Sequence, residues 1–251
     1  MASLAGRCAL ITGAGSGMGR SHALLMAERG ADVIVHDANA DGANETADGV
    51  RGLGRKAHVV VRDIRETAAW RDDIAAAEAA LAPIDVLVNN AGVSGRGLAF
   101  EDINEPTFDT LMAVHVKGTF FTSQAVAEGM KARRRGRIVN ISSTYGVAGA
   151  AQASHYAGAK AALLGFTKTW ARELAPFGIT VNAVAPGFIL TPMTARVLET
   201  PGRLERRISV IPLGRHGEAM DVSYAVAWLA SDEAAFVTGQ VLSPNGGEYI
   251  T

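Results

Sequence analysis

The chain lacks the features that mark secreted, membrane-spanning and metal-binding proteins. Cys8 is its only cysteine, so no disulfide can form within the chain and nothing indicates an oxidising compartment. No apolar run reaches the length that spans a bilayer, and the N-terminus shows no signal-peptide pattern. The histidines follow no metal-ligand spacing such as HExxH. We therefore expect a cytoplasmic protein without a metal site, in which Cys8 is buried in the first strand.

The chain also has almost no net charge and no linker. The 251 residues carry a formal net charge of -1, which provides no overall field for nucleic acid or an anionic membrane. The one strongly basic segment is KARRRGR at 131–137, where cations that complement a helix dipole are a simpler explanation than a polyanion site. No linker, repeat or low-complexity stretch divides the chain. With 48% hydrophobic residues, it can bury a sizeable core.

Short β-branched runs alternate with Ala-rich segments of helical spacing almost from end to end. The expected strands are 8–12, 32–36, 58–61, 84–88, 137–142, 179–184 and 239–243. Helical patterns lie between them, for example at 17–29, 66–81 and 105–132. Several strands contain three or more consecutive apolar residues, which is typical of strands that helices cover on both faces. The alternation predicts an α/β fold with a parallel, doubly wound sheet.

One long segment, 185–217, has neither a clear strand nor a regular helix. Loops of this length in compact domains are usually functional or disordered. Its many apolar residues favour a partly helical flap over a free linker. We expect a single domain over 1–251 that carries a substrate flap at about 187–217.

A glycine-rich loop follows the first expected strand and opens a helix. Residues 12–19 read TGAGSGMG, a TGxxxGxG pattern. The GxGxxG pattern fails, because Met18 and Arg20 stand where it would require glycine. Glycine has no side chain to block the approach of backbone amides and a helix N-terminus to a pyrophosphate. A tight turn would also explain the glycines, but their position between strand and helix favours a dinucleotide site.

Asp37 ends the second expected strand. An acidic side chain there can accept hydrogen bonds from the adenosine ribose hydroxyls and would repel a 2'-phosphate. Neither Ser16 nor Ala38 provides the cation that would bind this phosphate. Asp37 could instead cap the next turn. The pattern favours NAD over NADP.

Tyr156 and Lys160, in SHYAGAK at 154–160, are four positions apart and therefore neighbours on one helix face. Spacing alone favours an ordinary pair on one helix face. Oxidation of a secondary alcohol, however, requires a base that takes the hydroxyl proton as the hydride leaves. Tyrosine, with an unperturbed pKa of about 10, needs a nearby cation to serve as that base at neutral pH. Ser143 would hydrogen-bond the same substrate oxygen, although a turn serine is the simpler alternative.

These motifs together resemble the short-chain dehydrogenase/reductase family over nearly the whole chain. TGAGSGMG matches the cofactor loop of the family, NNAG at 89–92 matches the motif that supports the central sheet, and YAGAK matches YxxxK. Asp63-Ile64 resembles the adenine-contacting pair, and Pro186-Gly187 with Thr191 resembles the segment that holds the nicotinamide carboxamide. The resemblance implies a single-domain Rossmann fold with a seven-stranded sheet. It also implies an NAD-preferring enzyme of the 3-oxoacyl reductase-like subgroup.

The resemblance assigns roles to individual residues. The implied catalytic residues are Ser143, Tyr156, Lys160 and His115. The implied cofactor-binding residues are Gly13, Ser16, Gly17, Met18, Gly19, Asp37, Asp63, Ile64, Asn90, Ala91, Gly92, Tyr156, Lys160, Pro186, Gly187, Ile189 and Thr191. The implied substrate contacts are Ser94, Arg96, Tyr145, Gln152, Phe188 and Met193.

His115 departs from the family pattern, which has Asn at this position of the long fourth helix. In the family, the backbone carbonyl of that residue helps to hold a water that leads to the catalytic lysine. We hypothesise that His115 preserves this relay and that its ring adds a titratable group near neutral pH. A histidine that only packs the helix is the alternative.

The leading interpretation is an NAD-dependent dehydrogenase that acts on a small secondary alcohol or ketone, with no nucleic-acid or membrane partner. A 3-oxoacyl thioester reductase is the neighbouring alternative. A non-catalytic nicotinamide-binding regulator is the alternative from another class, but an intact Ser143, Tyr156 and Lys160 argues against it. The helices at about 105–132 and 154–175 carry more apolar residues than one covering face requires. In the family they pair between subunits, so we expect a homotetramer.

Overall fold

The structure is a computed structural model that describes residues 2–95 and 97–250. Strands and helices alternate along the chain, as the sequence predicts. The strands are β1 (Cys8–Thr12), β2 (Asp32–Asp37), β3 (Ala57–Val61), β4 (Val86–Asn89), β5 (Gly136–Ile141), β6 (Ile179–Val184) and β7 (Val241–Leu242). The helices are α1 (Gly17–Glu28), α2 (Ala40–Gly52), α3 (Trp70–Ala80), α4 (Glu105–Met112), α5 (Thr119–Arg133), α6 (Thr144–Ala148), α7 (Ser154–Leu174), α8 (Arg203–Ile208) and α9 (Ala219–Leu229). No helix of the described residues is long and apolar enough to cross a membrane.

Seven strands of the described chain form one parallel sheet in the order β3-β2-β1-β4-β5-β6-β7. The predicted doubly wound α/β fold is confirmed. Successive strands run outward from β1 to β3, and the chain then returns to the other side of β1 with β4. Ligands of such sheets bind beyond the carboxyl ends of the strands, at the point where the strand order reverses. The topology therefore places a binding cleft at the ends of β1 and β4.

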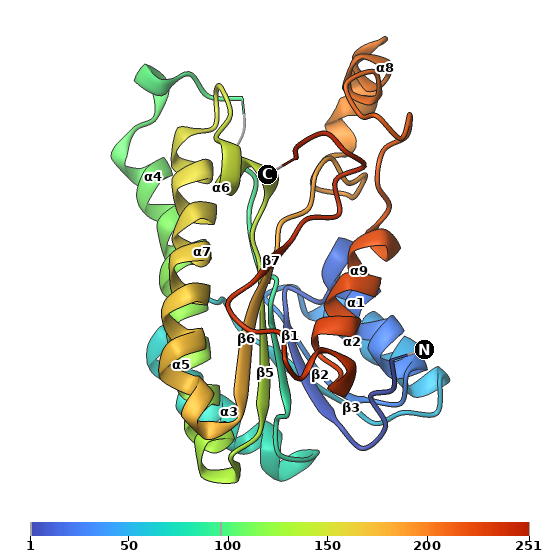
Figure 1. Cartoon of the computed structure of the whole chain (residues 1–251), viewed down its shortest axis with the longest axis vertical. Coiled ribbons are helices and arrows are strands. Elements are labelled where there is room, and N and C mark those ends of the chain that lie inside the picture. The colour runs from blue at the N-terminus through green and yellow to red at the C-terminus, as the bar shows by residue number, and fades with distance from the viewer. Residues whose placement is uncertain (1, 96, 251) are drawn as a thin grey trace.

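Helices cover both faces of the sheet. Figure 1 shows α1, α2 and α9 on one face and α3, α5 and α7 on the other. Successive strand residues point to opposite faces, so Ala9 and Ile11 of β1 join the core beneath α1, α2 and α9. Cys8 and Leu10 join the core beneath α3, α5 and α7. This double coverage explains why β1 is apolar from Cys8 to Ile11, and the predicted burial of Cys8 is confirmed.

Two elements differ from the sequence-based expectation. The last strand is limited to Val241–Leu242, because Gly239 has a positive φ of 73° and Pro244 has no amide hydrogen for the ladder. The helix expected at 105–132 is divided into α4 and α5 by a π-helical turn, Ala113–Gly118. A π turn interrupts the regular i to i+4 pattern and is often found at functional sites.

The segment expected to form a flap is partly helical, as predicted. It contains a 3-10 turn at Ala195–Glu199 and the short helix α8. Phe188 and Ile211 are buried in a small apolar cluster of their own, apart from the two large cores. Figure 1 shows α8 beyond the carboxyl ends of the strands, at the same end of the molecule as α6 and the start of α7.

Candidate active site

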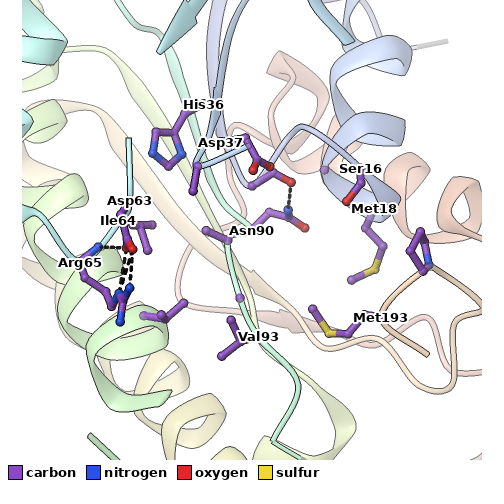
Figure 2. A pocket seen from close by; sticks show the side chains of 18 of the residues that line it. Ser16, Met18, His36, Asp37, Asp63, Ile64, Arg65, Asn90, Val93 and Met193 are labelled. Atoms are coloured by element: carbon purple, nitrogen blue, oxygen red, sulfur yellow. Dashed lines mark hydrogen bonds and ion pairs between the residues drawn. The ribbon is translucent and has the colours of Figure 1, made fainter. Parts of the chain in front are cut away.

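A cavity of about 430 Å³ lies at the carboxyl ends of the central strands, bordered by the loops that follow β1, β2, β3 and β4 (Figure 2). Most residues expected to bind the cofactor line it. They are Gly13, Ser16, Gly17, Met18, Gly19, Asp37, Asp63, Ile64, Asn90, Ala91, Gly92 and Thr191. The other five expected residues, Tyr156, Lys160, Pro186, Gly187 and Ile189, are outside this lining as the described residues define it.

The loop after β1 has the shape that a pyrophosphate requires. Gly13 has a φ of 65°, and a Cβ there would lie 2.8 Å from the Cα of Ala91. A Cβ at Gly19 would lie 2.1 Å from the carbonyl oxygen of Gly13. The first amides of a helix have no partner within it, and the Ser16 side chain does not cap those of α1. This helix end can therefore accept an anionic group from the cavity.

Polar contacts join this loop to the NNAG segment after β4. Thr12 Oγ1 accepts hydrogen bonds from the amides of Asn90 and Ala91, both at 3.0 Å. The Asn90 side chain donates in return to the carbonyl oxygens of Thr12 at 2.9 Å and Gly13 at 3.1 Å. Because these contacts connect β1 with β4, they fix the width of the cleft between them.

Asp37 ends β2 at the edge of the cavity. Its Oδ2 accepts from the Gly15 amide at 2.8 Å, and its Oδ1 accepts from the Asn39 amide at 2.9 Å. The carboxylate therefore organises the adjacent turns, which was the alternative role considered from the sequence. Each oxygen retains a second acceptor site, so the same carboxylate can also bind a ribose hydroxyl.

Two arginines that the sequence interpretation missed line the same cavity. Arg65 is paired with Asp63 through an Nη2 to Oδ2 distance of 2.6 Å (Figure 2), and this contact holds the pKa of the Asp63 carboxyl below its usual value. Arg62 is paired with Asp73 and, at 2.8 Å, with Glu66. Both follow β3, whose carboxyl end lies beside that of β2. That position was the signal that could have identified them.

Ser143, Tyr156 and Lys160 are all at least nine-tenths buried at the carboxyl end of β5. Helix α7 places Tyr156 and Lys160 on successive turns of one face, with Lys160 Nζ 5.8 Å from the centre of the Tyr156 ring. Lys160 Nζ donates to the carbonyl oxygen of Ile141 at 2.8 Å. The Ser142 hydroxyl donates to the carbonyl oxygen of Lys160, also at 2.8 Å. The lysine is thus held at both its side chain and its backbone.

Ser143 caps the short helix α6. Its Oγ accepts from the amide of Tyr145 at 3.2 Å. A hydroxyl that accepts one bond keeps its own proton for donation. The capping role and a contact with a substrate oxygen are therefore compatible.

His115 lies in the π-helical turn and is 1% exposed. Its Nε2 is 3.1 Å from the amide nitrogen of Val93 and 3.0 Å from the carbonyl oxygen of the same residue. Its ring meets that of Tyr156 edge-on, with centroids 5.6 Å apart. Burial, assisted by the positive charge of Lys160, lowers the His115 pKa to about 3. The hypothesis that this ring titrates near neutral pH is therefore wrong, because the buried site disfavours the charged imidazolium.

A second cavity, of about 440 Å³, adjoins the first and shares Met193 with it. The expected substrate residues Ser94, Tyr145, Gln152, Phe188 and Met193 line it, while Arg96 lies outside the described residues. The ring of Tyr145 is 6.3 Å from that of Tyr156, centroid to centroid, which connects this cavity to the catalytic candidates.

Two further lining residues, Arg203 and Arg207 of α8, were missed by the sequence interpretation. Their i, i+4 spacing in RLERRI, within the expected flap, was the available signal. Among the residues that the structure describes, no group of three or more His, Cys, Asp or Glu side chains could hold a metal ion.

Comparisons with known sequences extend over nearly the whole chain. A family model described as enoyl-(acyl carrier protein) reductase matches residues 13–248. The 3-oxoacyl-[acyl-carrier-protein] reductase FabG of Thermotoga maritima is 41% identical over 98% of this chain and 99% of its own length. The cyclopentanol dehydrogenase of Comamonas testosteroni is 38% identical over 95% of each chain.

Solved structures also match nearly the whole chain. A structure described as a short-chain alcohol dehydrogenase from Sinorhizobium meliloti 1021 has a TM-score of 0.93 and 37% identity, covering 98% of this chain and 97% of that one. A structure described as a 2-deoxy-d-gluconate 3-dehydrogenase from Agrobacterium tumefaciens, with bound NADP, has a TM-score of 0.90 and 36% identity, with the same coverage. The chain therefore belongs to the short-chain dehydrogenase/reductase family of nicotinamide-dependent oxidoreductases.

Proposed function

We propose that this protein is an NAD-dependent dehydrogenase that interconverts secondary alcohols and ketones in the cytoplasm. The observation that carries the proposal is the position of Ser143, Tyr156 and Lys160 at the end of β5, next to a cavity that suits a dinucleotide. A regulator that only bound the coenzyme would need the cavity but not these three side chains. Nucleic acid and membranes have no part in the proposed reaction.

Tyr156 is the proposed proton acceptor. A bound oxidised nicotinamide would accept the hydride from the alcohol carbon. The hydroxyl proton of the alcohol would pass to the Tyr156 oxygen, whose phenolate form the nearby Lys160 ammonium favours. Because Lys160 Nζ is tied to Ile141, its charge stays next to the tyrosine. Ser143 would donate a hydrogen bond to the substrate oxygen and stabilise the charge that develops there.

Asp37 supports NAD as the coenzyme. Its carboxylate would bind the ribose hydroxyls and repel a 2'-phosphate. Arg62 and Arg65 are the cations of the cavity lining that could bind a 2'-phosphate, but carboxylates of the protein already pair with both. The Agrobacterium tumefaciens relative carries NADP, so the fold alone does not decide the coenzyme. The proposal of NAD is supported by the local charge of Asp37.

A panel of secondary alcohols and ketones, followed by nicotinamide absorbance with NAD and NADP in parallel, tests this function. We expect turnover with a preference for NAD of about 100-fold in kcat/KM, which corresponds to about 3 kcal/mol. Asp37→Ala should reduce this preference at least tenfold, because it removes both the ribose contact and the repulsion. Asp48→Ala, on the exposed side of α2, is the control and should leave the preference for NAD unchanged.

Two results would count against the proposal. A wild-type preference for NADP would overturn the assignment of the coenzyme. Tight NAD binding with no turnover of any compound would favour the regulator instead.

A second candidate function is reduction of 3-oxoacyl thioesters. It is favoured by the description of the matching family model and by the 41% identity to the Thermotoga maritima reductase. The same panel separates the two functions when acyl thioesters are included beside simple ketones. A thioester that exceeds every simple ketone in kcat/KM would support the reductase.

We assign His115 a positioning role. Its neutral ring holds the main chain of Val93, where the loop that leads to the substrate cavity begins. The family relay uses the backbone carbonyl at this helix position, and a residue of any type at this position has that carbonyl. His115 would then shape the site without exchanging a proton.

His115→Asn should leave the pH dependence of kcat/KM unchanged between about pH 6 and pH 9, because a ring with a pKa of about 3 stays neutral throughout that range. We expect kcat within about threefold of wild type, because an amide can also hydrogen-bond the Val93 main chain. His115→Leu should lower the free energy of unfolding by about 1–3 kcal/mol, because it leaves buried polar groups unpaired. A displaced pH profile in His115→Asn would restore a proton-transfer role for the ring.

We propose a homotetramer with two self-contacts. The first would use an aromatic cluster on α5 and α7, formed by Phe120, Phe121, Phe166 and Trp170. Phe121 is 37% exposed, and large apolar groups of this kind often mark an interface. The second would use the sheet edge at β7, where Val241 and Leu242 are also partly exposed. Two different twofold contacts generate a tetramer.

Light scattering at micromolar concentration should give the mass of four 26.1-kDa chains. Phe121→Glu should reduce this mass, because it would bury a charge in the first contact. Leu53→Glu replaces an exposed leucine after α2, outside both proposed contacts, and should leave the mass unchanged. A monomeric wild-type protein would contradict the proposal.

A further inference from the structure

The second cavity has an uneven distribution of charge. Its described lining contains two cationic side chains, Arg203 and Arg207, and no carboxylate. The rest of the lining is apolar or neutral and polar, with residues such as Ser94, Gln152 and Phe188. Its volume of about 440 Å³ falls within the range of small-molecule sites. A neutral alcohol would make no use of the positive charge of this cavity.

Arg207 is held in a fixed orientation. Its Nη2 donates to Glu248 Oε1 at 2.8 Å, and its guanidinium lies 5.0 Å from the centre of the Phe188 ring. Glu248 is only 16% exposed, so the ion pair is partly shielded from water. One carboxylate of the protein therefore offsets one of the two positive charges.

Arg203 supplies the charge that remains. It lies one turn before Arg207 on α8, and its side chain makes no hydrogen bond or ion pair with the parts of the chain that the structure describes. A guanidinium presents its donors in a planar fork that matches the two oxygens of a carboxylate. The two arginines and Glu248 together leave a single positive charge, which one carboxylate neutralises. A phosphate group, with nearly two negative charges at neutral pH, would exceed it.

We propose that the alcohol substrate carries a carboxylate, and that Arg203 binds this group with the help of Arg207. This inference rests on the proposed dehydrogenase function and narrows its substrates to hydroxy acids and the corresponding oxo acids. The hydroxyl would face Tyr156, on the side of the cavity where Tyr145 stands. The carboxylate would face Arg203 and Arg207 of α8, which line the same cavity. Flap residues would then select the substrate by charge.

Matched substrate pairs test the inference: 3-hydroxybutyrate and 4-hydroxypentanoate, each compared with its methyl ester. We expect kcat/KM to favour the acids by about tenfold or more, mainly through a lower KM. Arg203→Gln should raise KM for the acids about tenfold and leave the esters unchanged. Arg206→Gln, an exposed arginine of the same helix outside the cavity lining, is the matched control and should retain the preference.

Glu248→Gln provides a test of opposite sign. Removing its charge should free Arg207 for the substrate, so KM should fall for the acids and not for the esters. A purely structural role of the ion pair would weaken both classes equally. Equal kcat/KM for acids and esters in the wild type, or an unchanged preference in Arg203→Gln, would overturn the inference.

Failure of the proposed dehydrogenase function can be distinguished from failure of the carboxylate site. If NAD binds but neither acids nor esters react, the proposed function falls. The carboxylate site is then tested by binding alone. The protein is first saturated with reduced coenzyme, 3-hydroxybutyrate is then added stepwise, and the fluorescence of the nicotinamide is followed. A response in the wild type and in Arg206→Gln that disappears in Arg203→Gln supports the site, and no response in the wild type rejects it.

Discussion

The attachment of Lys160 to the end of β5 is the contact on which the rest of the site depends. Its Nζ bonds to the Ile141 carbonyl, and its own carbonyl accepts from the Ser142 hydroxyl. Further along α7, Thr167 accepts from the buried Asn140 side chain of β5 at 2.9 Å. The hydrogen bond of the charged Lys160 ammonium contributes about 1.5–3 kcal/mol, and the two neutral hydrogen bonds contribute about 0.5–1.5 kcal/mol each. These contacts fix α7 against the sheet. Because Tyr156 lies on α7, they also fix the position of Tyr156.

The sheet topology brings the two cavities together. The reversal of strand order between β1 and β4 opens the cleft for the coenzyme, and the flap after β6 closes a second cavity beside it. Met193 belongs to both linings, so a coenzyme in one cavity and an alcohol in the other would meet near Met193. Tyr145 of the second lining lies beside Tyr156. The coenzyme side is built from strand ends and tight glycine turns. The proposed substrate side includes the flap, which lies outside the sheet.

Sequence reasoning identified the features that depend on local pattern. Apolar strands alternating with helices predicted the doubly wound sheet, and the glycines between β1 and α1 predicted a loop that lies at the edge of the first cavity. It failed where the outcome depends on tertiary surroundings. The low pKa of His115 results from burial beside Lys160, which spacing cannot reveal. Arg62 and Arg203 appear in sequence as ordinary surface cations, and only the fold shows that one is paired with carboxylates and the other lines a cavity.

The central claim is that Tyr156 transfers the proton while the coenzyme transfers the hydride. Tyr156→Phe tests it most directly, because phenylalanine keeps the ring that packs against His115 and Tyr145 and removes only the hydroxyl. The dissociation constant for NAD and the unfolding temperature should remain close to wild type. We expect kcat to fall by about 100-fold to 10,000-fold, the usual contribution of a general acid or base. A variant that retained kcat within about threefold of wild type would contradict the account.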